Sequence, residues 1–418
     1  SGNITMKGGV ATNSQLLPLA YTGSLGSEVV FDTGLNQFTG MCYDTTNDKI
    51  VITYQDSGNS DYGTAVVGTV SGTSISFGTP VVFNAAETTY TSPSFDSASG
   101  KVVIAYVNYS TGYGTAIVGT VSGTSISFGT AVTFASATTL YTEAGFDSNS
   151  NKVVVAYSDS GNSGYGTAIV GTVSGTSISF GTEVVFDSTG TLSAAFGGFV
   201  FDSTNNKVVI PYSIAGGATY GIVGPVSGPS ISFGTRVAIG SVSGQNLSVA
   251  FDSNAGKVVI NYRDANNSDY TGSVVGTVSG TSISFGTELV IEEVHNLGTT
   301  TFDSSDNKII FFYKSSSPGY YRIGTVSGTS ISYGSPVVFN AATVASLASA
   351  FDPDQGTAVI AYRDNSQGTA VGLALTGAVP NLAIGSTYYV QDDGTLATTS
   401  SSVTAGKAIA NTTLLLKG

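Results

Sequence analysis

Short apolar runs alternate with stretches rich in Gly, Ser, Thr, Asn and Asp along most of the chain. One stretch, from residue 145, reads GFDSNSNKVVVAYSDSGNSGYGTAIVGTVSGTSISFGTEVVF. Within it, a short first strand is expected to end at Phe146-Asp147. A second strand is predicted over Lys152 to Tyr157, because consecutive apolar residues are typical of a strand that is buried on both faces.

Two further strands complete this unit. The third is predicted from about Gly166 to Val173, where small residues allow neighbouring chains to approach closely. The fourth is predicted over Thr176 to Phe186 and opens with alternating polar and apolar residues, as in a half-exposed edge strand. The phrase GTVSGTSISFGT, which joins these two strands, occurs at residues 119–130, 171–182 and 276–287.

A tyrosine near the end of each second strand counts the repeats. The interval between successive copies runs from 49 residues (362 minus 313) to 55 residues (212 minus 157). Four short strands in about 50 residues are typical of a propeller blade, whereas an immunoglobulin-like domain needs about twice that length. We therefore predict an all-β fold, a seven-bladed β-propeller of four-stranded blades. The counting residues are Tyr54, Tyr106, Tyr157, Tyr212, Tyr262, Tyr313 and Tyr362.

The ends of the chain suggest how the ring closes. The last unit ends its third strand at Thr376-Gly377 and lacks a fourth strand, while SLGSEVVF at residues 24–31 aligns without a gap with SFGTEVVF at 179–186. We expect this N-terminal strand to complete the last blade; the alternative is NLAIGSTYYV at residues 381–390. The domains are then an N-terminal extension (1–23), the propeller (24–377) and a small C-terminal β module (378–418). One departure, Pro211 and Pro225 in the fourth unit, predicts irregular strands there.

Composition narrows the functional classes. Charged residues make up 10% of the chain, hydrophobic residues 41%, and the net charge is −13. The acidic balance argues against nucleic acid and anionic membrane surfaces as partners. The apolar runs have the length of strands, so no membrane span is expected, and no secretory signal pattern opens the chain. Cys42 is the single cysteine and is expected to lie in the core.

Loops at the two ends of the predicted ring differ in character. One end carries nearly uniform Asp-Ser-x-x-Asn/Gly-Lys turns, as at Asp147 to Lys152, and the repeated Ser-Gly-Thr-Ser hairpins. The Asp side chain is expected to cap its turn by accepting backbone N–H groups. A calcium site is a weak alternative, because Ca²⁺ needs several converging oxygen ligands and the Lys opposes a cation. We predict neither a metal nor a cofactor.

The other end carries loops that differ from unit to unit, and variable loops on a rigid scaffold are where binding sites are usually built. Tyr, Asn and Asp gather there, which suits stacking on sugar rings and recognition of sugar hydroxyls. The alternative is that these tyrosines cover the seams between blades. The candidate ligand-binding residues are Tyr62, Tyr109, Tyr113, Tyr165, Tyr220, Tyr270, Tyr320, Asn59, Asn162 and Asn266.

Catalysis finds little support in the sequence. His295 is the single histidine, and no nucleophile-elbow motif is present. Paired carboxylates for glycoside hydrolysis should break the repetition at the ring centre, whereas most available ones repeat with it. We therefore expect no enzyme and no catalytic residues. The carboxylates considered are Glu143, Glu292, Glu293, Asp56, Asp159, Asp264 and Asp364.

The segment IGSTYYVQDDGTLATTSSSVTAGKAIANTTLLLKG at residues 384–418 resembles the closing segment of repeat-rich structural proteins of marine tailed phages and other aquatic viruses. The VVGTVSGTSISFGTPVVFNAA units resemble the repeats that precede it there. The resemblance implies a non-enzymatic structural or adhesion protein on a virion exterior: a fibre, a tail appendage or a capsid decoration. It transfers no site residues. The alternatives are a secreted glycan-binding propeller from a cell and, less favoured, a glycoside-processing enzyme.

Partners follow from the same reasoning. Residues 1–22 and 378–418 are too short to build a core, yet they carry apolar groups of the kind that mark interfaces. We expect them to anchor the ring to other virion or surface subunits, so that the chain is oligomeric or particle-bound. The divergent loop face is then free to bind host-surface glycans as its carbohydrate ligand.

Overall fold

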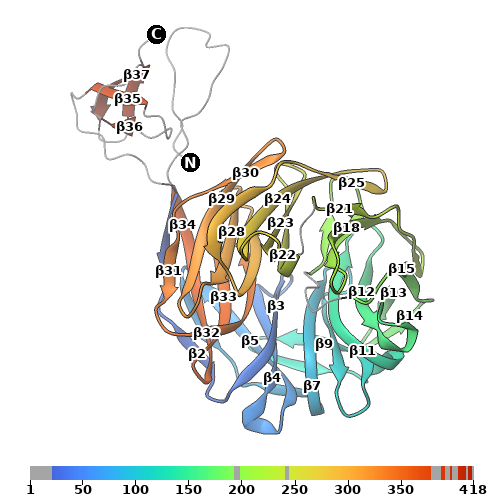
Figure 1. Cartoon of the computed structure of the whole chain (residues 1–418). Helices are drawn as coiled ribbons and strands as arrows, with labels where there is room; N and C mark the ends of the chain where they lie inside the picture. The colour runs from blue at the N-terminus through green and yellow to red at the C-terminus, as the bar shows by residue number, and fades with distance from the viewer. Residues whose placement is uncertain are drawn as a thin grey trace. The chain divides into compact units, whose positions relative to one another are not determined.

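The computed structural model describes residues 21–192, 198–240, 244–377, 387–390, 396–397, 403–410 and 413–416 (Figure 1). The chain divides into two compact units, one comprising Ser1–Ser24 with Leu375–Gly418 and the other Leu25–Ala374. Described residues form β-strands and two 3-10 turns, η1 (Ser57–Asn59) and η2 (Ser160–Asn162), with no α-helix among them. In this described part, no helix is long and apolar enough to cross a bilayer.

In the Leu25–Ala374 unit, each repeat of the sequence corresponds to one set of antiparallel strands, which we call a blade. Among the first three blades, the outer strand of the first continues into the inner strand of the second, and the outer strand of the second continues into the inner strand of the third. Thus the first part of β7 pairs with β5 and its second part pairs with β8. The strands of these blades are β3 (Asn36–Asp44), β4 (Lys49–Asp56), β5 (Tyr62–Ser71), β6 (Ser74–Phe77), β7 (Val81–Asp96), β8 (Lys101–Asn108), β9 (Tyr113–Ser122), β10 (Ser125–Phe128), β11 (Val132–Asp147), β12 (Lys152–Asp159), β13 (Tyr165–Ser174), β14 (Ser177–Phe180) and β15 (Val184–Asp187).

The next three blades have separate outer and inner strands. The fourth is irregular as predicted at Pro225, which has no N–H to donate and stands between β18 and β19, whereas the other blades continue the third strand through this position. The prediction is wrong for Pro211, which lies within the uninterrupted strand β17 and faces Gly221 of β18. The strands are β16 (Val200–Asp202), β17 (Lys207–Ser213), β18 (Thr219–Gly224), β19 (Val226–Ser227), β20 (Ser230–Ile231), β21 (Val237–Ala238), β22 (Gly244–Asp252), β23 (Lys257–Asp264), β24 (Tyr270–Ser279), β25 (Ser282–Phe285), β26 (Leu289–Val294), β27 (Leu297–Asp303), β28 (Lys308–Lys314), β29 (Gly319–Ser327), β30 (Ser330–Tyr333) and β31 (Val337–Asn340).

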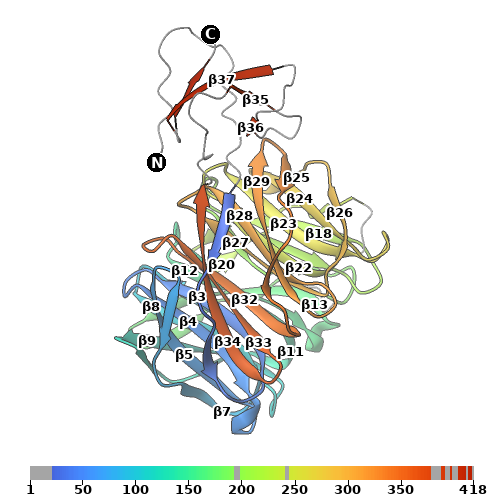
Figure 2. The same cartoon turned by 90° about the vertical axis from the view of Figure 1, so that its left-hand side faces the viewer.

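The last blade combines both ends of the propeller. Its strands β32 (Val344–Asp352), β33 (Thr357–Asp364) and β34 (Gln367–Gly377) lie side by side, and the N-terminal strands β1 (Tyr21–Leu25) and β2 (Val29–Asp32) pair with β34 (Figure 2). Val29 of β2 faces Ala370, and Val30 faces Thr369. In the described part of the competing segment 381–390, β35 (Thr387–Val390) instead pairs with β36 (Leu396–Ala397) and β37 (Val403–Ala410). A fourth strand, β38 (Thr413–Leu416), pairs with β37.

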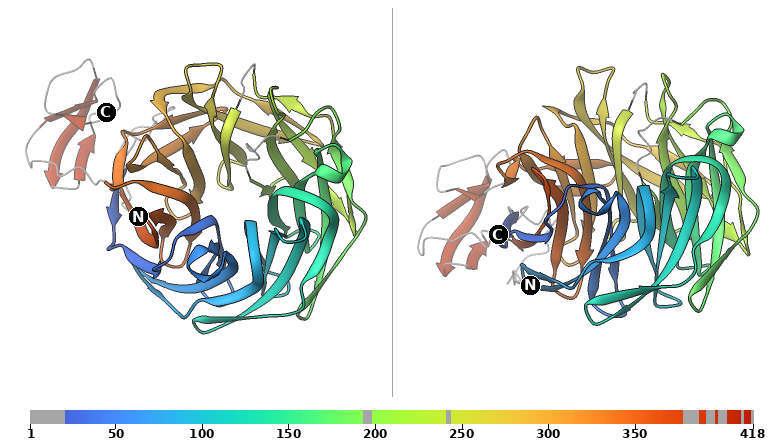
Figure 3. Two further views of the ribbon diagram at one scale, coloured as in Figure 1. Left: turned by 60° about the horizontal axis from the view of Figure 1, so that its bottom comes forward. Right: turned by 90° about the horizontal axis from the view of Figure 1, so that it is seen from below.

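The blades of the Leu25–Ala374 unit follow one another around a ring (Figure 3). The all-β prediction and the propeller class are therefore confirmed. Residues 193–197 and 241–243, at the borders of the fourth unit, lie outside the described residues, and the count of seven blades stays a prediction.

The hydrophobic core lies between adjacent blades rather than within one. In the seam between the third and fourth blades, Val154 and Ala156 pack with Val208 and Ile210. The second strands are buried at consecutive positions, as predicted, because both faces of each blade are covered. The counting tyrosines are among the largest fully buried side chains. Cys42 packs, partly buried, against the core between the first and second blades.

The repeated phrase is explained by a close contact at the blade seams. The glycine of its Phe-Gly-Thr end approaches the hairpin of the next blade so closely that a Cβ atom on Gly129 would lie 1.9 Å from the carbonyl oxygen of Thr176. The same contact joins Gly26 of the N-terminal segment to Thr73 of the first blade, at 2.0 Å. Equivalent contacts occur at Gly78, Gly181, Gly234 and Gly286.

This close approach also corrects the prediction of one continuous fourth strand over Thr176 to Phe186. The structure divides it into β14 and β15, which both pair with β13, and the break includes Gly181. The inner strand is longer than predicted: the part of β11 that pairs with β12 starts at Thr139 and ends at Asp147.

In several blades, a carboxylate directly before the outer strand reaches the counting tyrosine. The Tyr157 hydroxyl donates to Glu183 at 2.9 Å, and the Tyr262 hydroxyl donates to Glu288 at 2.8 Å. In the last blade Tyr362 donates to Glu28 at 2.8 Å, so the N-terminal segment, just before β2, supplies the same contact. Burial is the main cause that raises the pKa of these tyrosines above their ordinary range, and the carboxylate adds to it.

The uniform turns are capped as predicted. Asp147 accepts from the backbone N–H groups of Asn149 and Ser150 at 2.9 and 3.0 Å, and equivalent Asp residues do the same in other blades. The residue before the Lys adopts a left-handed backbone, with φ of 54° at Asn151 and 63° at Gly100. Because this region favours Gly and Asn, the Asn/Gly alternation in the motif has a backbone cause.

Candidate functional site

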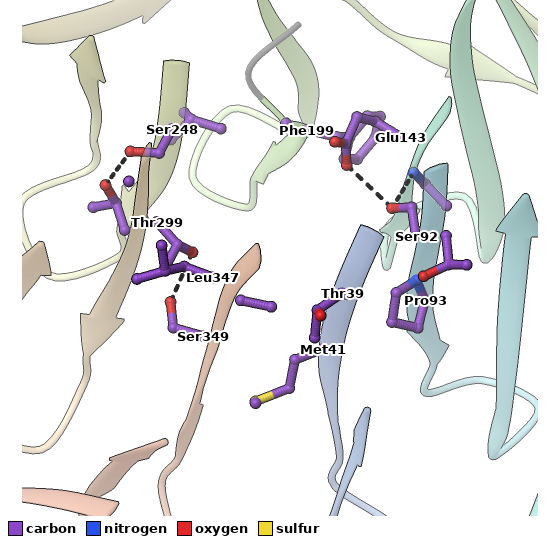
Figure 4. Close-up of a pocket in the computed structure, with 18 of the residues that line it drawn as sticks. Thr39, Met41, Ser92, Pro93, Glu143, Phe199, Ser248, Thr299, Leu347 and Ser349 are labelled. Carbon is purple, nitrogen blue, oxygen red and sulfur yellow. Dashed lines mark hydrogen bonds between the residues drawn. The ribbon is translucent and has the colours of Figure 1, made fainter. Parts of the chain in front are cut away.

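A cavity of about 280 Å³ lies among the inner strands, comparable to the smaller pockets that hold ligands (Figure 4). Its walls come from equivalent positions of successive inner strands, three to five residues before the Asp that starts each turn. Hydroxyl groups dominate the polar part of the lining. The lining residues are Thr39, Gly40, Met41, Thr91, Ser92, Pro93, Glu143, Ala144, Gly198, Phe199, Leu247, Ser248, Val249, Gly298, Thr299, Thr300, Leu347, Ala348 and Ser349.

A β-bulge places these residues. The pairing of β11 with β12 shifts between Leu140 and Glu143, so that Tyr141 and Thr142 together lie opposite Tyr157. The first bulge residue has a left-handed backbone, with φ of 55° at Tyr141. The same shift and a positive φ recur in β3, β7, β22 and β32, at Phe38, Tyr90, Asn246 and Ser346. Such bulges redirect side chains and often border functional sites.

Hydroxyl groups fasten neighbouring inner strands to one another around the cavity. Thr91 donates to the carbonyl oxygen of Phe38 at 2.6 Å, and Thr142 donates to that of Tyr90. Farther round, the hydroxyl oxygens of Ser248 and Thr300 lie 2.6 Å apart. The cavity wall is thus a hydrogen-bonded belt rather than a set of independent side chains.

Glu143 is the single ionisable side chain among the described residues that line the cavity. The Ser92 hydroxyl donates to Glu143 Oε2 at 3.1 Å and accepts from the backbone N–H of Ala144 at 2.9 Å (Figure 4). Burial raises the pKa of Glu143 to about 7, although the Ser92 hydrogen bond acts in the opposite direction. At neutral pH this carboxyl group therefore changes protonation state easily.

We expect Glu143→Gln to stabilise the fold at pH 8 by about 1–3 kcal/mol and to leave its stability at pH 4.5 nearly unchanged. The pKa rises on folding, so the protonated carboxyl is favoured in the folded chain. The contribution of Glu143 to the free energy of unfolding is complete below the pKa of the carboxyl group in the unfolded chain, and it is lost as the pH rises through 7. We keep the expected stabilisation at about 1–3 kcal/mol because Glu143 is only partly buried, so solvent screens part of the effect of its charge. Urea unfolding of both proteins at several pH values measures this, and a difference that does not change with pH would contradict it.

The predicted ligand-binding residues lie away from this cavity. The tyrosines Tyr62, Tyr113, Tyr165, Tyr220, Tyr270 and Tyr320 stand at or near the start of third strands, each in a different blade. Two of them take part in packing: Tyr220 lies under the Arg236 guanidinium, 4.0 Å from its ring centre, and Tyr320 stacks on Tyr313 at 5.7 Å. Asn59, Asn162 and Asn266 are exposed. None of the ten lines the cavity, and their binding role stays a prediction.

Tyr109 has a different position from the rest of the predicted set. Its side chain is 61% exposed, and its backbone N–H donates to Glu87 O at 2.9 Å, just before the inner part of β7 begins. The neighbouring Tyr90 has its pKa raised by burial first, and then by the Tyr141 and Tyr109 hydroxyls. Tyr109 thus lies close enough to Tyr90, a residue of a bulged inner strand, to influence its pKa.

Apart from Glu292, whose side chain lies outside the described residues, the other ionisable residues weighed in the sequence do not line the cavity with Glu143. Glu293 forms an ion pair with Arg322 at 2.8 Å, and Asp159 caps η2 through Gly161. His295 is fully buried, and burial lowers its pKa to about 4. Its ring contacts Thr271 at 2.9 Å and Asn246 O at 3.4 Å. Among the residues that the structure describes, no group of three His, Cys, Asp or Glu side chains is placed to hold a metal ion.

Sequence reasoning missed an arc of aromatic residues beside the cavity. Phe38, Tyr90 and Tyr141 stand one or two residues before the lining residues of β3, β7 and β11, and their rings contact in series at 4.9 and 5.1 Å between centroids. A signal existed: each stands six residues before the Asp of its turn (Asp44, Asp96 and Asp147). Its meaning depends on the bulge, which the alternation of residues does not reveal.

No family model matches the chain, and no curated protein matches it. Among solved structures, a K499G mutant of NanB sialidase from Streptococcus pneumoniae is similar over 84% of this chain and 71% of that chain, with 10% identity and a TM-score of 0.49. AofleA from Arthrobotrys oligospora is similar over 76% of this chain and 92% of that chain, with 8% identity and a TM-score of 0.46. These likenesses concern the architecture alone.

Proposed function

We propose that the chain is a non-enzymatic adhesion protein of a virion exterior that binds carbohydrate through the propeller. The observation that carries this proposal is the central cavity, with its belt of hydroxyls bordered by aromatic rings. Hydroxyl side chains donate and accept hydrogen bonds, as sugar hydroxyls do, and aromatic faces pack on the apolar C–H face of a sugar ring. The geometry thus supports recognition of a polyhydroxylated ligand.

The non-enzymatic part rests on the arrangement of carboxyl groups. Most glycoside hydrolases place two carboxyl groups on either side of the scissile bond. In the described cavity lining, Glu143 has no carboxyl partner: its polar neighbour is Ser92, at 3.1 Å. We therefore propose that a bound saccharide is held and released without being cleaved.

The location on a virion rests on the sequence. It is supported by the resemblance of residues 384–418 to phage structural proteins and by the net charge of −13. The proposed anchoring through residues 1–22 and 378–418 falls mostly outside the described residues; within the C-terminal segment, β35 to β38 form one antiparallel sheet. An edge strand of this sheet, such as β38, is suited to pairing with the sheet edge of a neighbour.

Binding of the purified full-length chain to a glycan array tests the proposed function. We expect a defined subset of glycans to bind, with no sugar released from the same glycans in a hydrolysis assay. Immunolabelling of purified particles should place the chain on their exterior. If glycans are cleaved and Glu143→Gln stops the cleavage, the chain is an enzyme. Presence in cell extract with absence from particles would favour the secreted lectin.

A further inference from the structure

We infer that the carbohydrate is a neutral saccharide, and that its sugar ring packs on the arc of Phe38, Tyr90 and Tyr141 while its hydroxyls bond to Ser92 and Glu143. This inference rests on the proposed function and names the ligand class and the residues that select it. It places the binding site at the bulged inner strands rather than at the separate tyrosines of the third strands.

The first support is the continuity of the arc across three blades. Phe38 and Tyr90 meet at an interplanar angle of 60°, and Tyr90 and Tyr141 meet at 76°. All three side chains are partly exposed, so part of each ring is accessible to a ligand. Three rings in edge-to-face contact form one rigid apolar surface. Tyr109, which is 61% exposed, lies close enough to Tyr90 to raise its pKa.

The second support is that each of two adjacent strands carries a ring and a hydrogen-bonding group close together in sequence. In β7 these are Tyr90 and Ser92, and in β11 they are Tyr141 and Glu143. Ser92 and Glu143 are already linked to each other at 3.1 Å, and both line the cavity. An apolar platform next to a small number of polar groups is the usual composition of a small-molecule pocket.

The third support is charge. Glu143 is the one ionisable residue in the described lining, and the chain as a whole carries a net charge of −13. A sialic acid or a uronic acid would place its carboxylate beside this residue with no cation in the described lining to balance it. The surroundings therefore reject anionic sugars and accept neutral ones, since a carboxyl group can bond to a sugar hydroxyl in either protonation state.

The test compares neutral and sialylated glycans as probes at pH 8, using the full chain. Wild type should bind neutral glycans and bind sialylated versions at least about tenfold more weakly. Tyr141→Leu and Tyr90→Leu should each lower affinity for the neutral glycan about tenfold, because stacking is lost. Tyr141→Phe keeps the ring and should retain binding. Tyr113→Ala, on the same blade as Tyr90 but outside the arc, is the matched control and should bind like wild type.

Glu143→Gln provides a second readout that a folding defect would not produce. It should narrow the preference for neutral over sialylated glycans several-fold, because the repelling charge is removed. Thermal melting of each variant separates loss of the fold from loss of the site.

Several outcomes would overturn the inference while leaving carbohydrate binding intact. These are equal binding of neutral and sialylated glycans, loss of binding in Tyr113→Ala but not in Tyr141→Leu, and unchanged selectivity in Glu143→Gln. Competition by choline at the site would also overturn it, since an aromatic arc with a carboxylate can hold a cation instead. If no glycan binds at all, the proposed function itself fails.

Discussion

Removal of residues 1–31 is expected to open the propeller and cause aggregation, whereas removal of residues 1–20 leaves it folded. The longer deletion takes away β1 and β2, which pair with β34, and exposes that sheet edge to other chains. It also removes Phe31, which is 6% exposed and packs on Tyr54 at 5.4 Å. Loss of such a buried ring alone costs about 3–5 kcal/mol. Melting temperature and light scattering measure the effect.

The reciprocal deletion serves as the control. Removal of residues 378–418 should leave the blades folded, because the described contacts that complete the last blade come from the N-terminal strand. The opposite pattern, in which the C-terminal deletion unfolds the propeller and the N-terminal one is tolerated, would show that residues 381–390 close the ring.

Gly129→Ala is expected to destabilise the propeller by about 2–3 kcal/mol, because the new methyl group has no room at the blade seam. Its Cβ would lie 1.9 Å from the carbonyl oxygen of Thr176, a backbone atom that cannot move aside without shifting its hairpin. Neither residue is charged or lines the cavity, so the effect reports packing between blades. Urea unfolding of the purified variant measures the change.

Gly334→Ala is the matched control for this substitution. Gly334 occupies the same place in the sequence pattern, yet the nearest atom to the position that its new methyl group would take is Ile323 O, at 3.8 Å. The substitution should therefore change stability by less than about 0.5 kcal/mol, or raise it slightly by restricting the unfolded chain. Equal destabilisation by both variants would mean that seam packing is not the cause.

Much of the fold could be predicted because its determinants are local and repeated. Tyr157 and its equivalents mark the second strands, and the Asn/Gly before each Lys reflects a backbone with positive φ. The break at Gly181 could not be predicted, since it arises from contact with the next blade. In the sequence this contact is visible only as a repeated motif, and its structural role becomes clear only when the neighbouring blade is known.

The pairing of the N-terminal strand β2 with β34 has a physical basis in the side chains of that segment. In the N-terminal segment, Glu28 meets Tyr362 and Phe31 meets Tyr54. The competing segment aligns Thr387 with Glu28 and Val390 with Phe31, and so offers neither the carboxylate nor the ring. The sequence alignment alone allowed either residues 24–31 or residues 381–390 to form this strand. The side-chain partners of Glu28 and Phe31 distinguish the two segments.

The candidate site was harder to predict than the fold. Tyrosines on variable loops were expected to gather, but the structure distributes Tyr62, Tyr165 and Tyr270 over separate blades. The arc of Phe38, Tyr90 and Tyr141 arises because bulges bring one residue from each of three repeats together. Such a site is difficult to recognise in a repeat sequence, because each of its residues resembles an ordinary strand residue. The residues come together only when the repeats are arranged around the propeller axis.

The contact between Glu28 and Tyr362, which are 334 residues apart, has a consequence for biosynthesis. During translation the first blade can form early. The strand that carries Phe31, which packs on Tyr54, cannot pair with the last blade until β34 has left the ribosome. Closing so long a loop is slow compared with forming hairpins. Most of the chain therefore exists for a time as an unclosed row of blades with two free ends, and a chaperone that shields those ends should raise the yield of soluble protein more than one that acts on the finished ring.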